Sequence, residues 1–246
     1  MSATTSYLRP GMDEDDEDAA PPDRRRRALL IVAAVVVAAV LITWLVAFSP
    51  VLGVSTVQVR GMHVLTAAQV RAAADITDGT PLVRIDTTAI TRRIERLAEV
   101  ESAQVRTSFP STVVITVDER TPVGYVRRGG RDVLVDRTGD QYRTVPSAPV
   151  GLPRFVVPDG TDSRTTGGAV ATVAAALPAA LLKKVASIEA LDPRAISLVL
   201  RHGRVVAWGS AERSADKARI LPALLAQPGT QFDVSDPDQP FSRGAP

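Results

Sequence analysis

The longest apolar stretch of the chain is residues 28–48, which contains 21 residues without a charge. As an α-helix with a rise of ~1.5 Å per residue it would be about 32 Å long, which matches the hydrocarbon core of a bilayer. Thirteen of these residues are Leu, Ile, Val or Phe, and each favours membrane insertion by about 0.3 to 0.6 kcal/mol at central positions. The pattern predicts a single transmembrane helix over residues 28–48.

The charges that flank this stretch predict its orientation. Arg24, Arg25, Arg26 and Arg27 stand directly before it, and the positive-inside rule keeps such a cluster in the cytoplasm. We therefore expect a type II protein of the plasma membrane, with the N-terminus inside and the remainder outside. Trp44, near the far end, suits an interfacial aromatic belt. A cleaved signal peptide and a buried helix of a soluble core are the alternatives, although a signal core is shorter and precedes a small-x-small site.

Residues 1–27 have few apolar residues and carry an acidic run at positions 13–18. Such a segment cannot bury enough surface to offset the entropy lost on ordering. It is predicted to be a disordered cytoplasmic tail that either solubilises the protein or docks a cytoplasmic partner.

The pattern after the apolar stretch predicts a small α+β unit. Thr66 and Gln69 have the spacing of a capping box at the start of one helix, and Asp86 or Thr87 can cap a second. Alternating apolar and polar positions predict three strands, over residues 54–60, 102–108 and 112–120. The predicted order is therefore β-α-α-β-β.

From residue 122 onward, strand periods dominate. Alternation predicts strands over residues 123–126, 133–135, 141–145, 152–157, 185–190, 196–200 and 205–208. Helical patterns cover residues 165–184 and 215–226, and each contains a proline, Pro178 and Pro222, that disfavours an unbroken helix. The fold class expected for the whole chain is α+β, with a transmembrane helix, a β-α-α-β-β domain and a mixed β-rich domain.

The C-terminal segment has the pattern of one further strand. Phe232 and Val234 alternate with polar neighbours, and Pro237 and Pro240 follow. Proline cannot donate a ladder hydrogen bond, so its presence favours a sheet edge over a sheet centre. We expect this strand to be an edge strand, so that a charge or proline at Phe232 or Val234 would not unfold the protein.

Composition narrows the range of function classes. The chain has no cysteine, so it forms neither disulfides nor thiolate metal sites. The net charge is only +2 and there is no basic block outside residues 24–27, so a nucleic-acid surface is not indicated. Stability outside the membrane must come from packing.

Catalytic patterns are missing from the sequence. There is no P-loop, dinucleotide-binding glycine pattern, HExxH or GxSxG, and His63 and His202 stand alone. Asp118 and Glu119 point to opposite faces of a predicted strand. Three further acidic residues lack an EF-hand pattern: Asp132, Asp136 and Asp140. We expect a protein that is not an enzyme and that has no metal and no cofactor.

The β-α-α-β-β order, the run VRTSFP at residues 105–110 and the run TVVITVDERTP at residues 112–122 resemble a POTRA domain. Together with the short tail, the predicted anchor and the β-rich remainder, the chain is similar to the FtsQ/DivIB family of bacterial cell-division proteins. The succession from Leu134 to Tyr142 is similar to the hairpin that opens the family's β domain. The resemblance implies a POTRA domain over residues 52–121 and an FtsQ-type β domain over residues 122–246.

The resemblance also implies a function. It implies a scaffold of the division septum that binds FtsB-type and FtsL-type partners and links them to septal peptidoglycan synthesis. Other division proteins would bind the POTRA domain. In this family the small coiled-coil partner FtsB docks by adding a strand near the C-terminus, which here implies six partner-binding residues: Gln231, Phe232, Asp233, Val234, Ser235 and Phe241.

Two other functions fit parts of the pattern. A POTRA module of a transport or secretion assembly also binds strands, but it normally stands beside a membrane β-barrel, and the sequence has no series of alternating ten-residue segments. An anchored exported enzyme, such as a wall hydrolase, would need a catalytic group that the sequence lacks.

Overall fold

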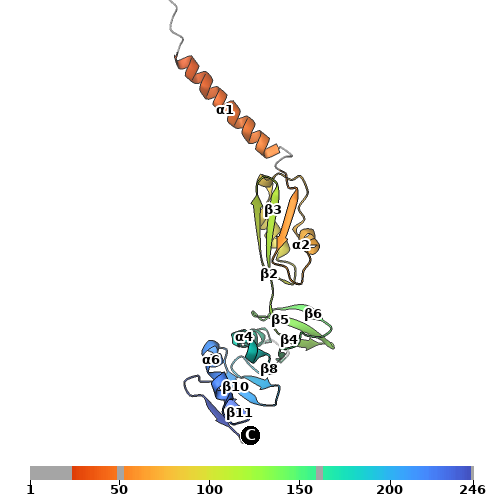
Figure 1. Cartoon of the computed structure of the whole chain (residues 1–246), viewed down its shortest axis with the longest axis vertical. Coiled ribbons are helices and arrows are strands. Elements are labelled where there is room, and N and C mark those ends of the chain that lie inside the picture. The colour runs from red at the N-terminus through yellow and green to blue at the C-terminus, as the bar shows by residue number, and fades with distance from the viewer. Residues whose placement is uncertain (1–23, 49–52, 159–162, 245–246) are drawn as a thin grey trace, which may run out of the picture.

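The computed structural model describes residues 24–48, 53–158 and 163–244. They form three parts that follow one another along one axis: helix α1, a proximal domain and a distal domain (Figure 1). The proximal domain is built on a three-stranded sheet and the distal domain on a nine-stranded sheet. Most of the predicted tail, residues 1–23, lies outside the described residues.

Helix α1 spans Arg24–Phe48, so it begins at the first arginine of the basic cluster. Its described large apolar side chains are exposed, for example Leu29 at 68% and Ile42 at 62%. Within the described part of the chain, no helix has both the length and the apolar character needed to cross a bilayer. The transmembrane span over residues 28–48 stays a prediction.

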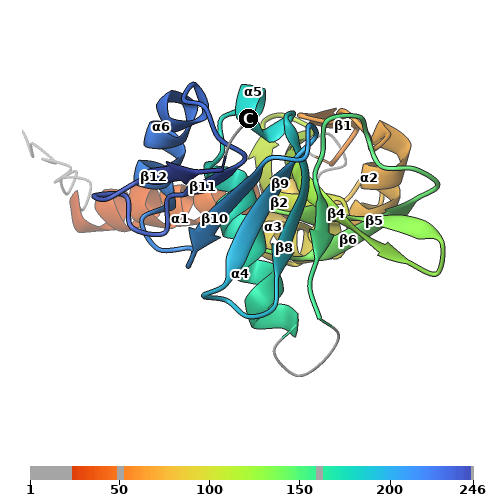
Figure 2. The same ribbon diagram turned by 90° about the horizontal axis from the view of Figure 1, so that it is seen from below.

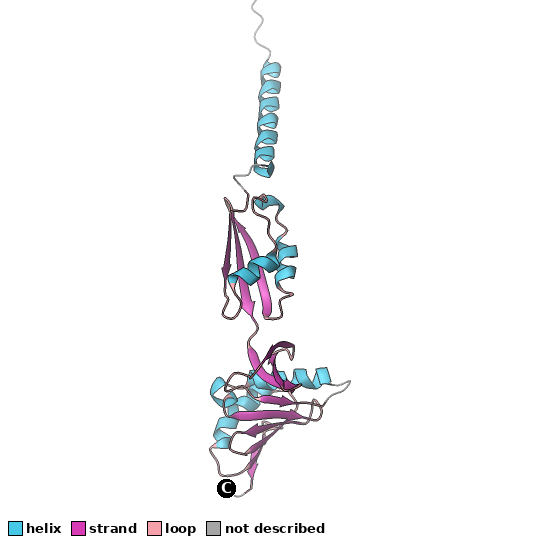
Figure 3. Ribbon diagram, turned by 90° about the vertical axis from the view of Figure 1, so that its right-hand side faces the viewer, coloured by secondary structure: helices cyan, strands magenta, loops and turns pink. Residues whose placement is uncertain are grey.

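The proximal domain follows the expected β-α-α-β-β order. Its elements are β1 (Thr56–Arg60), α2 (Ala67–Ala74), the 3₁₀ helix η2 (Leu82–Arg84), α3 (Thr87–Ile94), β2 (Val100–Ser108) and β3 (Thr112–Glu119). The sheet order is β1-β3-β2, with β1 parallel and β2 antiparallel to β3. Helices α2 and α3 pack on one face of this sheet (Figure 3).

Local chemistry explains where the proximal helices begin. The Thr66 side chain accepts from the Gln69 backbone N–H while the Gln69 side chain accepts from the Thr66 N–H, which is the predicted capping box. Asp86 caps α3 by accepting from Ala89 N at 2.9 Å. The predicted apolar face of β3 forms the core, because Val113, Ile115 and Val117 are fully buried.

The distal domain contains the remaining elements. Its strands are β4 (Pro122–Arg128), β5 (Arg131–Asp136), β6 (Gln141–Val145), β7 (Arg154–Val156), β8 (Val185–Ala190), β9 (Ile196–Leu200), β10 (Val205–Gly209), β11 (Gln231–Asp233) and β12 (Phe241–Arg243). Its helices are α4 (Ser163–Ala176), α5 (Ala179–Leu182) and α6 (Ser214–Leu225). The sheet order is β12-β11-β10-β9-β8-β7-β4-β5-β6, and Figure 2 shows β12 and β11 toward its left and β4, β5 and β6 toward its right.

One face of the nine-stranded sheet carries the distal core. Ile188 and Leu198 on neighbouring strands pack with Val170 of α4 and Leu221 of α6 in one buried cluster. Residues at alternate positions on the same strands, such as Ser187, belong to the opposite face. Helices α4 and α6 therefore cover the core face.

The two prolines in the helical patterns have different outcomes. Pro178 separates α4 from α5, as the sequence predicts. Pro222 lies inside α6 without ending it. Leu221 and Leu224 on either side of Pro222 are buried, and this packing offsets the lost backbone hydrogen bond.

The C-terminal strands correct one prediction. β11 lies between β10 and β12, parallel to the first and antiparallel to the second, so it is an interior strand. Phe232 is only 2% exposed and Val234 is fully buried. The expectation that these two side chains lie on an edge strand is wrong, because a second short strand, β12, follows the prolines and covers β11.

Candidate partner-binding site

β12 forms one end of the nine-stranded sheet. Its residues Phe241, Ser242 and Arg243 stand opposite Asp233, Phe232 and Gln231 of β11. In the described part of the chain no strand pairs with the outer side of β12. The backbone groups on that side are available to an added strand.

The loop from β11 to β12 is held by short-range hydrogen bonds. The Asp233 carboxylate accepts from Ser235 N at 2.8 Å and from Ser235 Oγ at 2.6 Å. Asp238 N donates to Asp236 Oδ1 at 3.0 Å. These aspartate turns lead the chain past Pro237 and Pro240. Proline has no backbone N–H group, so neither residue leaves an unpaired donor in the loop.

A contact with Arg213, the residue before α6, holds the same loop from outside. Arg213 binds both carboxylate oxygens of Asp238, at 2.8 and 2.9 Å. This two-point contact raises the pKa of Arg213 and lowers that of Asp238, in each case through the hydrogen bonds first. β12 is thus positioned by the helix that covers the core as well as by β11.

A hollow of about 150 Å³ lies beside the outer strand. The Phe241 side chain is 47% exposed at its rim, and the Arg243 guanidinium lies 5.5 Å from the centre of the Phe241 ring. The residues that line the hollow are Val205, Ala207, Gln231, Phe232, Asp233, Phe241 and Arg243. An extended segment on β12 could place alternate side chains over this hollow.

The six residues expected at a partner site therefore have different environments. Gln231 and Ser235 are exposed, Asp233 is half-buried, and Phe241 is exposed on β12. Phe232 and Val234 belong to the core. Two further residues border the site but are hard to find from the sequence. Arg243 lies in a strand of only three residues, and Val205 reaches the site only because β10 pairs with β11.

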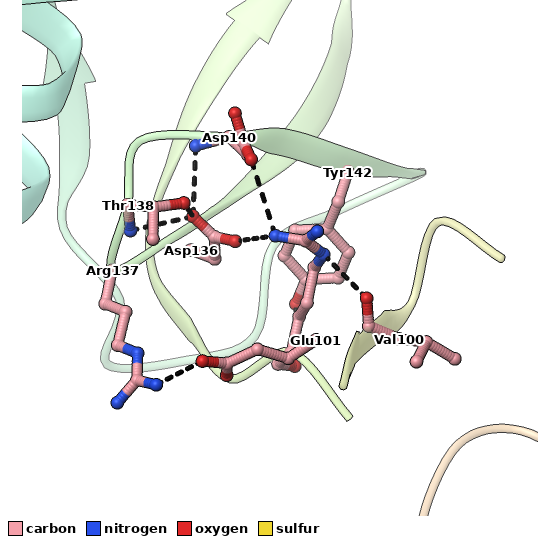
Figure 4. Close-up of polar contacts among 8 residues, drawn as sticks. Val100, Glu101, Asp136, Arg137, Thr138, Asp140 and Tyr142 are labelled. Carbon is pink, nitrogen blue, oxygen red and sulfur yellow. Dashed lines mark hydrogen bonds and ion pairs between the residues drawn. The ribbon is translucent and has the colours of Figure 1, made fainter. Parts of the chain in front are cut away.

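A separate cluster of polar side chains joins the two domains. It centres on Arg120, which lies between β3 and β4. Its Nε donates to Val100 O at 3.1 Å, and its Nη1 forms an ion pair with the Asp136 carboxylate. Asp140 lies 3.5 Å from the same Nη1. Figure 4 shows Asp136 and Asp140 of the distal domain facing Val100 of the proximal domain across this cluster.

Asp136 is buried and saturated with hydrogen bonds. It accepts from Thr138 N at 2.9 Å, Thr138 Oγ1 at 2.6 Å and Asp140 N at 3.0 Å. Burial raises the pKa of Asp136, but the hydrogen bonds from Thr138 and Arg120 outweigh burial and leave its pKa below the ordinary value. The carboxylate is therefore charged at neutral pH.

Further contacts strengthen this junction. Arg137 pairs with Glu101 of β2, and Tyr142 Oη donates to Arg120 O at 3.4 Å. Gly139 in the β5–β6 turn packs so closely on α4 that a Cβ there would lie 2.8 Å from Gly168 Cα. The turn that holds Arg120 is thus also fixed against the distal helix layer.

Other polar residues singled out in the sequence have structural partners. Glu119 accepts from Val64 N and Leu65 N at 2.9 and 2.8 Å, which ties β3 to the segment before α2. Asp132 pairs with Arg127 at 2.9 Å and accepts from Ala148 N at 2.8 Å. In the described residues, no three His, Cys, Asp or Glu side chains gather in a way that could hold a metal ion.

Comparison with protein families gives two matches. Residues 52–120 match a family model described as a POTRA domain of FtsQ type. Residues 124–237 match the C-terminal domain of the cell division protein FtsQ/DivIB. The junction cluster on Arg120 lies where these two matched segments meet.

Individual relatives agree with the family matches. The chain is 37% identical to cell division protein FtsQ of Mycolicibacterium smegmatis over 196 residues, which are 80% of this chain and 59% of that protein. It is 39% identical to cell division protein FtsQ of Streptomyces collinus over 219 residues, covering 82% of each. The chain spans about 60% of the length of the mycobacterial relatives that it matches.

A solved structure is also similar. It is the major extracytoplasmic domain of the trans isomer of the cell division protein DivIB from Geobacillus stearothermophilus. The match has 22% identity and a TM-score of 0.36, and it covers 44% of this chain and 93% of that one.

Proposed function

The chain belongs to the FtsQ/DivIB family of cell division proteins, and from this premise we propose that it is a membrane-anchored scaffold of the division septum. It acts by holding other proteins in place and not by turning over a substrate. Its partners are FtsB-type and FtsL-type division proteins, and through them it is linked to septal peptidoglycan synthesis. Its POTRA domain recruits further division proteins.

The proposed anchor is helix α1. Its apolar side chains, such as Leu29 and Ile42, are more than 60% exposed, and lipid is the environment in which such exposure is stable. The basic cluster at its start supports a cytoplasmic N-terminus by the positive-inside rule. Both folded domains then stand outside the plasma membrane.

The observation that carries the proposed partner contact is the open outer side of β12. An FtsB-type segment would pair with this strand and place an apolar side chain over the hollow next to Phe241. Backbone hydrogen bonds would supply affinity, and the hollow with Arg243 would supply selectivity.

A pair of proline variants tests this contact. Adjacent residues of a strand point their N–H groups to opposite sides in the plane of the sheet, so one of Ser242 and Arg243 faces β11 and the other faces outward. We expect one of Ser242→Pro and Arg243→Pro to weaken binding of an FtsB-type partner at an unchanged melting temperature. The other should lower the melting temperature as well.

Thr144→Pro on β6, at the opposite end of the sheet, is the matched control and should keep full partner binding. Binding is measured by pull-down of a purified FtsB-type partner, and folding by circular dichroism. Full recovery of the partner by both β12 variants would exclude β12 as the docking strand.

A further inference from the structure

The end of the proximal domain that lies nearest α1 carries two exposed apolar side chains. Val83 of η2 is 54% exposed, and Phe109 of the β2–β3 turn is 64% exposed. We propose that these two residues and their segments, here called the membrane rim, insert into the lipid interface of the outer leaflet. The inference rests on the proposed anchoring by α1.

Hydrogen bonds from the entry segment of the domain hold both parts of the membrane rim. Val54 N donates to Thr80 O at 2.9 Å, and Gly79 N donates to Val54 O at 2.8 Å. On the other side, Ser55 N donates to Ser111 O at 2.9 Å. The turn before η2 and the β2–β3 turn therefore flank the residues through which the chain enters the domain.

The strand directions place this end toward the membrane. β1 begins at Thr56 and runs parallel to β3, which leads on to the distal domain. The β2–β3 turn and η2 thus lie at the end next to α1, and the junction with the distal domain lies at the other end (Figure 1).

The reach of the chain keeps the membrane rim close to the anchor. Only five residue steps separate Phe48, the last residue of α1, from Gly53, and they span at most about 18 Å when fully extended. Helix α1 also comes close to η2. An anchor that ends at the lipid surface therefore brings the membrane rim to the depth of the headgroups.

The side chains of the membrane rim suit an interface. Leu82, next to Val83, and Val113, at the start of β3, already fill the core and are 3% and 0% exposed. Val83 and Phe109 are thus not needed for packing within the domain. Asp78 and Arg84 of the same end have opposite charges, so apolar insertion and not net charge is the attraction that we infer.

Insertion of the membrane rim would determine how the proximal domain stands on the bilayer. The junction on Arg120 would pass that orientation on to the distal domain and to β12. The partner-binding edge would then be held at a fixed height and direction above the membrane.

Spin labels can test this because the chain has no cysteine. The full chain is reconstituted in nanodiscs of phosphatidylcholine and phosphatidylglycerol, with a nitroxide at Ser108→Cys, the last residue of β2 and the neighbour of Phe109. Accessibility to oxygen and to a water-soluble nickel chelate is then measured. We expect the label at 108 to be more accessible to oxygen than to nickel, as lipid-inserted labels are.

Two reference labels make the outcome decisive. Val64 lies at the far end of the same domain and is 52% exposed. A label at Val64→Cys should therefore be accessible to nickel. Ala33→Cys in α1 reports the anchor. A nickel-accessible label at 108 with a lipid-buried label at 33 would overturn the inference alone, whereas a nickel-accessible label at 33 would overturn the anchor and the inference with it.

A Phe109→Asp exchange adds a second readout. Phe109 is exposed, so the variant should fold normally, and its label at 108 should shift to the nickel accessibility of the Val64→Cys site. An unchanged oxygen accessibility at 108 in this variant would mean that Phe109 does not insert.

Discussion

Asp136 shows how a single buried charge is made tolerable in this protein. A lone buried carboxylate is strongly unfavourable, but this one accepts from two backbone N–H groups, the Thr138 hydroxyl and Arg120. The proton-free form is therefore favoured despite burial. Because Arg120 also binds Val100 O, the same carboxylate joins the two domains.

We predict that Asp136→Asn lowers the free energy of unfolding by roughly 1.5 to 3 kcal/mol, because charge-assisted hydrogen bonds are lost in a buried site. The folded-state pKa of Asp136 lies below its ordinary value of 3.8. Its contribution is thus complete above pH 3.8 and is lost as the pH falls through the folded pKa. Urea unfolding at neutral and acid pH checks both effects.

Asp140→Asn is the matched control for this change, because the Asp140 side chain is 72% exposed. We expect it to change stability by less than about 0.5 kcal/mol. Equal effects of the two exchanges would show that Asp136 has no special role at the junction.

Lys217 is a buried cation with carbonyl partners. Its Nζ donates to Trp208 O at 3.0 Å and to Ser210 O at 2.9 Å, and the residue is only 2% exposed. Burial lowers its pKa below the ordinary value of 10.5. The charged form is therefore disfavoured by folding, and stability should rise as the pH increases through the folded pKa toward 10.5.

We predict that Lys217→Met abolishes this alkaline rise. At neutral pH it should also cost about 1 to 3 kcal/mol, because one buried and one half-buried carbonyl lose their donor. Chemical unfolding between neutral and alkaline pH measures both. The exposed Lys184→Met should keep the wild-type profile, and a Lys217→Met protein with a wild-type profile would contradict the account.

The elements that sequence could predict are those determined by nearby residues. The caps at Thr66 and Asp86 depend on contacts three residues apart, and the alternation in β3 depends on one strand. In contrast, β11 enters the sheet beside β10 in parallel, pairing Gln231 with Val205. Nothing local encodes that pairing, so the sequence placed Phe232 and Val234 at an edge.

The same limit applies to the candidate sites. The partner site near the C-terminus, including Phe241, stays a prediction, and its strand β12 has only three residues, which is too short a pattern to detect in the sequence. The junction was missed because Arg120 and Asp136 are 16 positions apart and meet only when two domains form. Buried charge pairs of this kind leave no periodic signal.

The difference between β11 and β12 leads to a prediction on two phenylalanines. Phe232 is 2% exposed with the Arg204 guanidinium 4.2 Å from its ring centre, so Phe232→Glu should cost at least about 3 kcal/mol and unfold the distal domain. Phe241→Glu should change stability by less than about 0.5 kcal/mol and still abolish binding of an FtsB-type partner. Thermal unfolding and pull-down separate the two.

A larger loss of stability for Phe241→Glu than for Phe232→Glu would contradict the assignment of Phe232 to the core and Phe241 to the edge strand. A stable Phe232→Glu protein that fails to bind would return the docking strand to β11.

The two domains follow α1 in a line (Figure 1), and we infer that the junction on Arg120 determines how far they can bend relative to each other. Arg120 of the linker pairs with Asp136 of the distal domain. Arg137 of the distal domain pairs with Glu101 of the proximal domain. The linker itself is short, because β3 ends at Glu119 and β4 begins at Pro122. A stiff connection of this kind would keep β12 at a constant distance from the membrane.

We predict that Arg120→Gln loosens this connection. Nitroxides at Arg92→Cys on α3 and Thr172→Cys on α4 report the distance between the domains, and pulsed electron paramagnetic resonance measures its distribution. The distribution should be narrow in the parent and clearly broader with Arg120→Gln. Arg143→Gln, on the edge strand β6, should leave it narrow, and a parent distribution that is already broad would contradict a stiff junction.

We have proposed that this protein works by presenting the outer side of β12 to another division protein. The most direct measurement is photo-crosslinking in dividing cells, with a benzophenone amino acid in place of Phe241 on β12 or, for comparison, Thr144 on β6. We expect position 241 to capture an FtsB-type protein and position 144 to capture none. Capture of that partner at position 144 and not at position 241 would contradict it.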